Sequence, residues 1–372
     1  MALLDCGCKD YRGSVRDYET KKAIPDATIF HGGQAVRSDK AGEFVLGRVD
    51  LAQPVLIKAA GYRCLRLGVP EKGALTAELE PFETRGVYLS YDALGRPEVR
   101  ARVMSWLASK RLDTLVIDIK DERGRMTFYN SAPRAGQMGA FGAVKFDDIA
   151  TFVKDLHQKG VCVVGRISVF RDSALAEHNP EWTVKCKRRS SMFWLDPFRE
   201  EVRNYNLIIA KEAAAHGFDE IQFDHVRFPE EREAPEARYS RRDTPGNRSN
   251  AIARFWREAQ RQLASSNVYL SVGTASIGSL SAVGSDASAG PDYFAPQFGS
   301  GQGWAGGAGS AGGSRISLRP YIPCGSGMAD QGLQAAVAAC RAGGTSGWVL
   351  WDPDGKYDVS RDLIGTLGAR DE

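Results

Sequence analysis

The 372-residue sequence has no excess of charge of one sign and no long hydrophobic run, and each absence excludes a class of protein. Its formal net charge is only +3, with Lys and Arg interspersed among Asp and Glu, so the composition gives no support to nucleic-acid binding. No apolar run approaches the ~20 residues of a membrane span, so we expect no transmembrane segment. The composition, with 43% hydrophobic and 26% charged residues, is typical of a globular protein.

Cysteine pairs and short catalytic motifs are also missing. The seven cysteines are scattered and odd in number, without the CxxC pairs of zinc sites, so we interpret them as structural thiols. The HExxH, GxSxG, P-loop and EF-hand spacings are absent, so we expect no metal and no cofactor. Cys6 or Cys8 fits the remnant of a trimmed export segment or lipid-attachment site. Under that interpretation the protein is periplasmic or on the cell surface, although no intact signal peptide is seen.

Residues 1–82 are predicted to form a small all-β sandwich. From Tyr11 to about Glu80, short runs of alternating apolar and polar residues are separated by turn signals every ~8–12 residues. The inward positions of these runs are Val15, Ala27, Ile29, Phe44, Leu46, Val55 and Ile57. The segments AIPDATI, SDKAGEFVL and KAAGYR resemble the carboxypeptidase regulatory-like domain. That resemblance implies no catalysis, and it leaves two roles open: a docking or glycan-contact module, or a spacer that packs on the rest of the chain.

Residues 83–372 change to alternating strand and helix periods, which predicts an α/β fold. Strands are expected at 86–90, 114–120, 161–169, 221–224, 268–273, 293–297, 316–322 and 347–351. Helices are expected at 97–109, 147–159, 200–216, 249–265 and 330–342. Eight strands in such alternation favour a closed (β/α)8 TIM barrel over an open sheet. The long insertions at 121–145 and 172–196 both follow strands, so we expect them at the face where the strands end.

The run GFDEIQFDHVRFP at 217–229 has the profile of a buried strand that delivers a carboxylate to its end. By the two-residue period of a strand, Gln222 and Asp224 share one side of this run. Asp224 would then lie at the barrel mouth, where barrel enzymes hold their catalytic groups. His225 would point to the opposite layer, so we expect a packed histidine rather than a general base.

Several further motifs, in the same order, resemble those of a bacterial family assigned to the glycoside hydrolases, which has a TIM-barrel fold and is largely of unknown function. They are DTLVIDIKDERG at 113–124, GRISVFRD at 165–172, LDPF at 195–198 and GWVLWDPDGKY at 347–357, and with the 217–229 run they cover the chain from about Thr84 onward. The resemblance implies hydrolysis of O-glycosidic bonds in a polysaccharide or cell-surface glycan. It gives no indication of the oligomeric state.

Glycosidic cleavage uses two carboxyl groups that flank the bond. Asp224 is our first candidate, and the alternative is an acid that only pairs with Arg227. In members of the family we expect the second acid at the end of the fifth strand, where this chain has Gly273 and Thr274. An amylase-like pattern would also require Arg two residues before Asp224, where this chain has Gln222. The available substitute acids are Asp118, Asp121, Asp286 and Asp352, of which Asp118 is best placed by strand order.

Polar and aromatic residues at the strand ends are the candidates for substrate binding. They are Lys120, Arg166, Gln222, Arg227, Trp304, Arg319, Trp351 and Asp352. The four cations among them would either receive an acidic sugar such as a uronate or neutralise Asp118 and Asp224, and we favour neutralisation. Trp304 lies in a loop of mostly Gly, Ala and Ser at 299–314, which is either a lid over a ligand or a plain surface loop.

A non-catalytic glycan-binding protein is the alternative to a hydrolase. It would retain the groove and lack the second acid, as Gly273 suggests. A deacetylase or lyase acting on the same glycans would usually need a histidine-rich metal site, which the sequence lacks. Hydrolytic carboxyl pairs lie ~5–9.5 Å apart, so the distance from Asp224 to the nearest second carboxyl distinguishes the two leading hypotheses.

Overall fold

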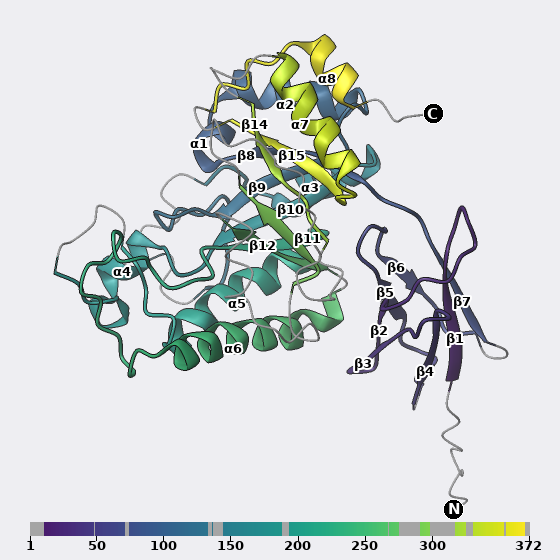
Figure 1. Ribbon diagram of the computed structural model, residues 1–372, viewed down its shortest axis with the longest axis horizontal. Helices are drawn as coiled ribbons and strands as arrows, with labels where there is room; N and C mark the ends of the chain where they lie inside the picture. The colour runs from purple at the N-terminus through teal and green to yellow at the C-terminus, as the bar shows by residue number, and fades with distance from the viewer. Residues whose placement is uncertain are drawn as a thin grey trace, which may run out of the picture. The chain divides into compact units, whose positions relative to one another are not determined.

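The structure is a computed structural model in which two compact units are distinguished (Figure 1). It describes residues 11–47, 49–70, 74–132, 136, 144–187, 193–266, 268–274, 291–297, 317–324, 330–352 and 355–368. The N-terminal unit comprises Met1–Glu83 with Leu263–Tyr269, and the barrel unit comprises Thr84–Gln262 with Leu270–Glu372. Of the positions singled out above, Cys6, Cys8, Asp286 and Trp304 lie outside the described residues.

The N-terminal unit is built from two small β-sheets, so the all-β prediction for this part is confirmed. Its strands are β1 (Tyr11–Asp17), β2 (Thr28–His31), β3 (Gln34–Arg37), β4 (Glu43–Leu46), β5 (Val55–Lys58), β6 (Leu65–Leu67) and β7 (Leu75–Leu79). One sheet has the order β4-β1-β7, and the other has the order β3-β2-β5-β6. All pairs are antiparallel except β1 with β7.

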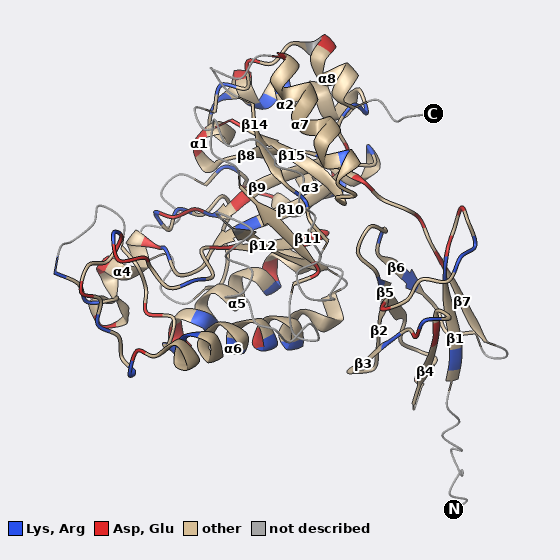
Figure 2. Ribbon diagram, in the orientation of Figure 1, with Lys and Arg blue, Asp and Glu red and all other residues tan. Residues whose placement is uncertain are grey.

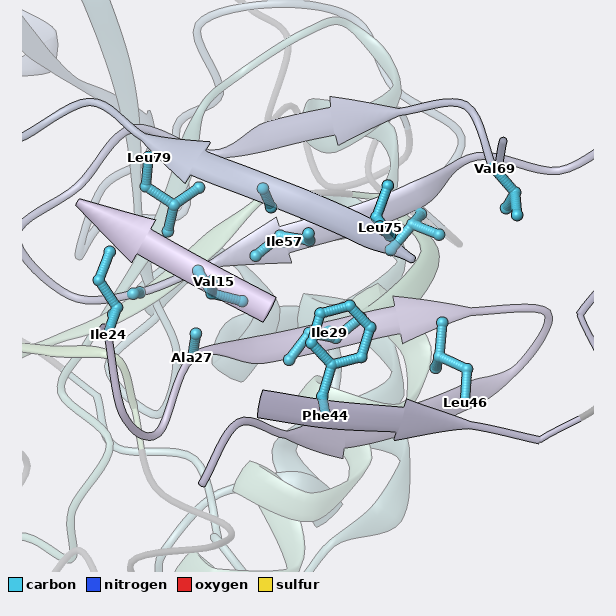
Figure 3. Packing of buried hydrophobic residues seen from close by; sticks show 13 residues of the cluster. Val15, Ile24, Ala27, Ile29, Phe44, Leu46, Ile57, Val69, Leu75 and Leu79 are labelled. Atoms are coloured by element: carbon cyan, nitrogen blue, oxygen red, sulfur yellow. The ribbon is translucent and has the colours of Figure 1, made fainter. Parts of the chain in front are cut away.

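The core of this unit is formed by the alternating apolar residues of its strands (Figure 3). All seven inward positions expected from the sequence belong to one buried cluster. At Gly13 of β1 an added Cβ would lie 2.3 Å from the Phe44 ring, so this glycine lets the Phe44 side chain pack against the β1 backbone.

The barrel unit contains eight strands that follow one another in chain order around a nearly closed ring, which confirms the predicted barrel. They are β8 (Thr84–Leu89), β9 (Thr114–Lys120), β10 (Cys162–Ser168), β11 (Glu220–Asp224), β12 (Tyr269–Thr274), β13 (Tyr293–Pro296), β14 (Tyr321–Pro323) and β15 (Gly347–Trp351). The strand pairs with a described register are parallel. Parallel bridges from Phe294 to Leu318 and from Gln297 to Tyr321 join the two ends of the sheet.

Helices alternate with these strands. They are α1 (Tyr91–Leu94), α2 (Pro97–Ala108), α3 (Ile149–Gln158), α4 (Ser173–His178), α5 (Glu200–Ala215), α6 (Pro245–Leu263), α7 (Asp330–Ala342) and α8 (Arg361–Leu367), with short 3-10 helices at Pro180–Trp182 and Ala264–Ser266. Among the described residues, no helix is both long and apolar enough to cross a membrane. Positive and negative residues are interspersed over the ribbon (Figure 2), as the composition predicts.

The interior of the barrel is layered. Its apolar layer brings together residues of five different strands, namely Val116, Val164, Ala295, Tyr321 and Val349. Two residues further along β9 and β10, toward the carboxyl ends of the strands, the inward positions become Asp118 and Arg166. The polar end of the barrel therefore begins directly above an apolar layer.

Candidate active site

A single guanidinium group organises the polar end of the barrel. Arg166 of β10 has a side chain only 5% exposed, and it donates hydrogen bonds to three carboxylates. Its Nη1 lies 2.7 Å from Asp118 Oδ1, and its Nη2 lies 2.6 Å from Glu122 Oε1. The third acceptor is Asp224 Oδ2, at 2.9 Å from Nε and 2.5 Å from Nη2. Three acids, one each from β9, β11 and the turn after β9, thus share one cation. Asp118, Glu122, Asp224 and Arg166 are called the acid cluster below.

Asp118 is the most deeply buried of the three acids, with a side chain 2% exposed. Besides Arg166, its carboxylate accepts hydrogen bonds from the Tyr88 hydroxyl at 3.0 Å and from the Tyr91 backbone N–H at 2.9 Å. Burial outweighs the attraction of Arg166 and raises the pKa of Asp118 to about 6. This carboxyl therefore changes its charge close to neutral pH.

The other two acids are held ionised. Burial would raise the pKa of Asp224, but the charges of His225 and Arg166 outweigh burial and hold that pKa well below its usual range. Burial likewise opposes ionisation of Glu122, but the charges of Arg166 and His225 lower its pKa to about 2. The Glu122 side chain is 26% exposed, which makes it the most accessible acid of the cluster.

The prediction that His225 points away from Asp224 is wrong. Strand β11 ends at Asp224, and His225 has a left-handed backbone with a φ of 54°, so the alternation of strand side chains no longer applies to it. Its Nδ1 lies 3.7 Å from Asp224 Oδ1, 4.0 Å from Glu122 Oε1 and 3.1 Å from Ser168 Oγ. His225 therefore lies beside the acid cluster.

The arrangement of Glu122, Asp224 and His225 resembles a metal site, because one ligand atom from each lies within 4.8 Å of the others. Arg166 Nη2, however, donates to both carboxylates from between them. A metal ion at this position would have to displace the guanidinium group. In this structure the cluster is completed by Arg166, and one carboxylate oxygen of Glu122 lies within 4.8 Å of one carboxylate oxygen of Asp224.

Lys120 leaves the barrel interior although it lies only two residues after Asp118. Opposite β10, the register passes from Asp118 paired with Arg166 to Lys120 paired with Ile167, so two residues of β9 face one of β10. Such a bulge re-aims the side chains that follow it. The Lys120 ammonium is completely buried and lies 2.5 Å from Asp172 Oδ2. Lys120 is therefore bound in a buried ion pair outside the acid cluster.

Arg227 and Arg319 also pair with acids other than Asp118 and Asp224. Arg227 binds the Glu233 carboxylate with both Nη atoms, at 2.6 and 2.9 Å. Arg319 lies just before β14, where its Nη1 contacts Glu220 Oε2 at 2.6 Å. Since Glu220 is the first residue of β11, this ion pair lies at the opposite end of that strand from Asp224. Of the four cations, only Arg166 reaches the two predicted catalytic acids.

The remaining predicted binding residues have partners of their own. Gln222 accepts a hydrogen bond from the Tyr321 hydroxyl at 2.5 Å inside the barrel. Asp352 is buried and accepts a hydrogen bond from the Tyr357 backbone N–H at 2.6 Å. Trp351 is partly buried and packs against the apolar interior layer. Substrate contacts of these three residues stay predictions, and Trp304 lies outside the described residues.

A comparison with known protein families assigns a large part of the barrel unit to a family. Residues 86–287, more than half of the chain, match the family described as "Putative glycosyl hydrolase domain". The chain belongs to this family. The match spans strands β8 to β12, and with them every member of the acid cluster. No match is found among curated proteins.

Solved structures similar to this chain include glycoside hydrolases with a barrel fold. Alpha-L-fucosidase isoenzyme 2 from Paenibacillus thiaminolyticus is 13% identical with a TM-score of 0.54, over 77% of this chain and 48% of that chain. The pneumococcal exo-beta-D-N-acetylglucosaminidase StrH, with its GH20 catalytic modules, is 9% identical with a TM-score of 0.51, over 77% and 81% of the two chains. A hypothetical protein from Ruminiclostridium thermocellum is 30% identical with a TM-score of 0.42, over 50% of this chain and 96% of that chain. At these identities the two hydrolases support the fold alone.

The glycosyl hydrolase domain has a glycine beside its central carboxylate. A Cβ added at Gly273 of β12 would lie 2.9 Å from Asp224 Cγ and 3.0 and 3.2 Å from its two oxygens. Any side chain at position 273 would therefore displace the Asp224 carboxylate from its present position. In this chain the nearby second acid is instead Glu122, in the turn after β9.

Glu122 is the residue that the sequence analysis missed. It follows Asp121 in the motif DTLVIDIKDERG, where the sequence analysis considered Asp121 but not Glu122 as a substitute acid. The signal that would have found it is the run of two acids followed by Arg123 and Gly124, which indicates a tight turn at the barrel mouth. Asp121 itself closes that turn, because its carboxylate accepts from the Arg123 and Arg125 backbone N–H groups.

Proposed function

We propose that this protein hydrolyses a glycosidic bond in a polysaccharide or cell-surface glycan at the cluster of Asp118, Glu122, Arg166 and Asp224. The observation that carries the proposal is the group of three carboxylates around Arg166 at the carboxyl end of the barrel, in which one oxygen of Glu122 and one oxygen of Asp224 lie within 4.8 Å of each other. Retaining glycosidases hold their two carboxyls ~5–5.5 Å apart, whereas inverting enzymes need ~6.5–9.5 Å to admit a water. Carboxylate oxygens this close leave little room for a water between them, which fits the retaining reaction better than the inverting one.

Asp224 is assigned the role of nucleophile. Its low pKa keeps it ionised, and its hydrogen bonds from Arg166, Gln297 and the His225 backbone fix its orientation. An Asp224 oxygen attacks the anomeric carbon as the bond to the leaving oxygen breaks, and a second acid gives that oxygen its proton. Water then cleaves the glycosyl ester, and the second acid takes back a proton.

Two acids are candidates for the proton donor, and different observations favour each. Asp118, with a pKa of about 6, is partly protonated near neutral pH, but its side chain is 2% exposed. Glu122 is far more accessible, but Arg166 and His225 hold its pKa at about 2 in the free protein. A bound glycan that excludes water from Glu122 would raise that pKa, because burial disfavours the charged carboxylate.

The first experiment is a screen of bacterial surface polysaccharides for released reducing ends, with wild type and Asp224→Asn side by side. Release by wild type and none by a folded Asp224→Asn variant is the expected result. If Asp224→Asn cleaves as well as wild type, the assignment of this site must be abandoned.

The proton donor is then identified with two versions of the cleaved glycoside, one with its natural leaving group and one with a dinitrophenyl leaving group that needs no protonation. Loss of the donor should lower kcat/KM, which reports formation of the glycosyl ester, on the order of 10²-fold or more for the natural substrate and much less for the activated one. Glu122→Gln and Asp118→Asn are compared in this way. The variant that shows the selective loss has lost the proton donor, and an equal loss on both substrates contradicts that role.

A glycan-binding protein without catalysis is the second candidate function. The observation that favours it is Gly273, which leaves β12 without the acid expected there. Under this alternative, no glycan in the screen yields reducing ends with wild type, while binding of a polysaccharide is still measurable.

A further inference from the structure

A cavity of about 380 Å³ lies beside the acid cluster, between the segment that follows β10 and the segment that follows β11. Its walls include Glu177, Lys185, Phe193, Trp194 and Glu233. None of the three clustered carboxylates lines it, and neither does Arg166. Its volume is in the range of pockets that bind small ligands, which span ~300–1,000 Å³.

The cavity is connected to the catalytic strand through Trp194. The Trp194 ring meets the His225 ring edge-on, with centroids 5.9 Å apart, and His225 directly follows Asp224. On the other side, the Arg227 guanidinium lies 4.6 Å from the centroid of the Trp194 ring and holds the Glu233 carboxylate. The residues that leave β11 therefore build one side of the acid cluster and one wall of the cavity.

Backbone hydrogen bonds form this cavity without any ligand. Lys185 and Arg238 exchange two backbone hydrogen bonds, at 3.0 and 2.7 Å, which join the two segments. The Lys185 ammonium is fixed at the wall by the Pro180 carbonyl and by Thr183 Oγ1 at 3.0 Å. A preformed site loses less conformational entropy on binding than a site that the ligand must order.

The chemistry of the walls suits a sugar ring. Phe193, with the small exposed part of Trp194, gives apolar surface for the ring, while the Lys185 ammonium and the exposed Glu177 carboxylate can donate to and accept from its hydroxyls. The wall charges have both signs, and Glu233 is already neutralised by Arg227. A charged sugar would meet repulsion from one of these groups, so the walls favour an uncharged one.

We propose that this cavity is a subsite for one uncharged pyranose unit of the glycan whose scissile bond lies at Asp224. This inference rests on the proposed hydrolase function and extends it. The enzyme then recognises a chain that continues past the cleaved bond, and oligosaccharides long enough to reach the cavity bind more tightly than shorter ones.

The test is calorimetric binding of three uncharged probes, cellohexaose, maltohexaose and chitohexaose, to the full chain carrying Asp224→Asn, which prevents turnover. Adding Lys185→Ala or Glu177→Ala should weaken the Kd of the bound hexaose about tenfold, as expected for loss of a hydrogen bond to a charged group. Lys187→Ala and Glu181→Ala are the matched controls, because both are exposed residues of the same insertion that do not line the cavity. They should change the Kd less than twofold. If Asp224→Asn does not fold, the slowed background is whichever of Glu122→Gln and Asp118→Asn has lost the proton donor in the leaving-group assay.

Two results would overturn the subsite: equal affinities for the cavity variants and their controls, or no binding of any probe to folded protein. The outcome for the hydrolase is separate, because it depends on cleavage by wild type. Cleavage that requires Asp224, together with cavity variants of unchanged affinity, would remove the subsite and leave the hydrolase. Cavity-dependent binding without cleavage of any glycan would remove the hydrolase and leave a sugar-binding cavity.

Discussion

Asp118→Asn is the substitution that tests the electrostatics of the acid cluster most directly. In the folded protein the pKa of Asp118 is raised from 3.8 to about 6, mainly by burial. The folded state therefore binds this proton more tightly than the unfolded state, and the stability it contributes is present below pH 3.8 and lost as pH rises through 6. The difference between the two pKa values corresponds to about 3 kcal/mol.

Asn removes this titration and retains an oxygen that accepts from Tyr88 and Tyr91. We therefore expect the free energy of unfolding of Asp118→Asn, measured relative to wild type, to rise by about 2 kcal/mol between pH 4 and pH 7, because the unfolded carboxyl is already partly ionised at pH 4. The assay is urea unfolding at several pH values, followed by tryptophan fluorescence. All seven tryptophans follow Glu83 in the sequence, so the signal reports on the barrel unit alone.

The control is Asp155→Asn, which removes an exposed carboxyl from α3 and so separates a change in net charge from the effect of burial. A difference between Asp118→Asn and wild type that stays constant or falls from pH 4 to pH 7 would refute the reasoning. It would mean that Arg166 stabilises the Asp118 carboxylate by more than burial destabilises it, and Asp118 could then not be the proton donor.

Three further predictions follow from the same structure. Arg166→Gln should lower the free energy of unfolding by about 3–5 kcal/mol at pH 7, because it leaves buried carboxylates without a cation. The loss should be smaller at pH 4, where protonation removes the charge of these carboxylates. Urea unfolding at both pH values measures this. Gly273→Ala should leave the protein folded but reduce turnover of any cleaved glycan on the order of 10²-fold, because the new Cβ displaces Asp224. Limited proteolysis should cut near residues 81–84 and separate residues 1–82 from the barrel, and mass spectrometry showing one indivisible core would contradict this domain division.

The fold was predictable from the sequence because buried strands and amphipathic helices have distinct periods. The bounds of β9, β15 and α7 agree with the prediction to the residue. The seventh strand was expected at 316–322, whereas β14 runs from Tyr321 to Pro323. Apolar residues alternate from Ile316 onward, but ladder pairing with β15 begins only at Tyr321, and pairing with a distant strand is not visible in a local pattern.

Asp118, Arg166 and Asp224 were predictable from the sequence, whereas Glu122 and the position of His225 were not. Asp118 and Asp224 were found because strand ends in a parallel barrel meet at one face. Lys120 was expected beside them, but the bulge at the end of β9 changes the direction of its side chain, which forms a buried ion pair with Asp172 instead. Glu122 lies two residues past the end of β9, beyond this bulge, where the two-residue period of the strand no longer gives the side-chain direction. The bulge itself depends on how β9 pairs with β10 and not on the residues of β9 alone.

The position of Arg166 explains how the cluster forms although Gln222 stands where an amylase-like pattern has Arg. In the ladder between β10 and β11, the direct partner of Gln222 is Arg166. An arginine at this neighbouring position reaches the Asp224 carboxylate from the side, with Nε and Nη2 both on Oδ2. From β10 the same guanidinium also reaches Asp118 and Glu122, which it could not do as easily from the strand of Asp224 itself. The arginine in β10 thereby allows a carboxyl in the turn after β9, rather than one on β12, to become the second acid beside Asp224.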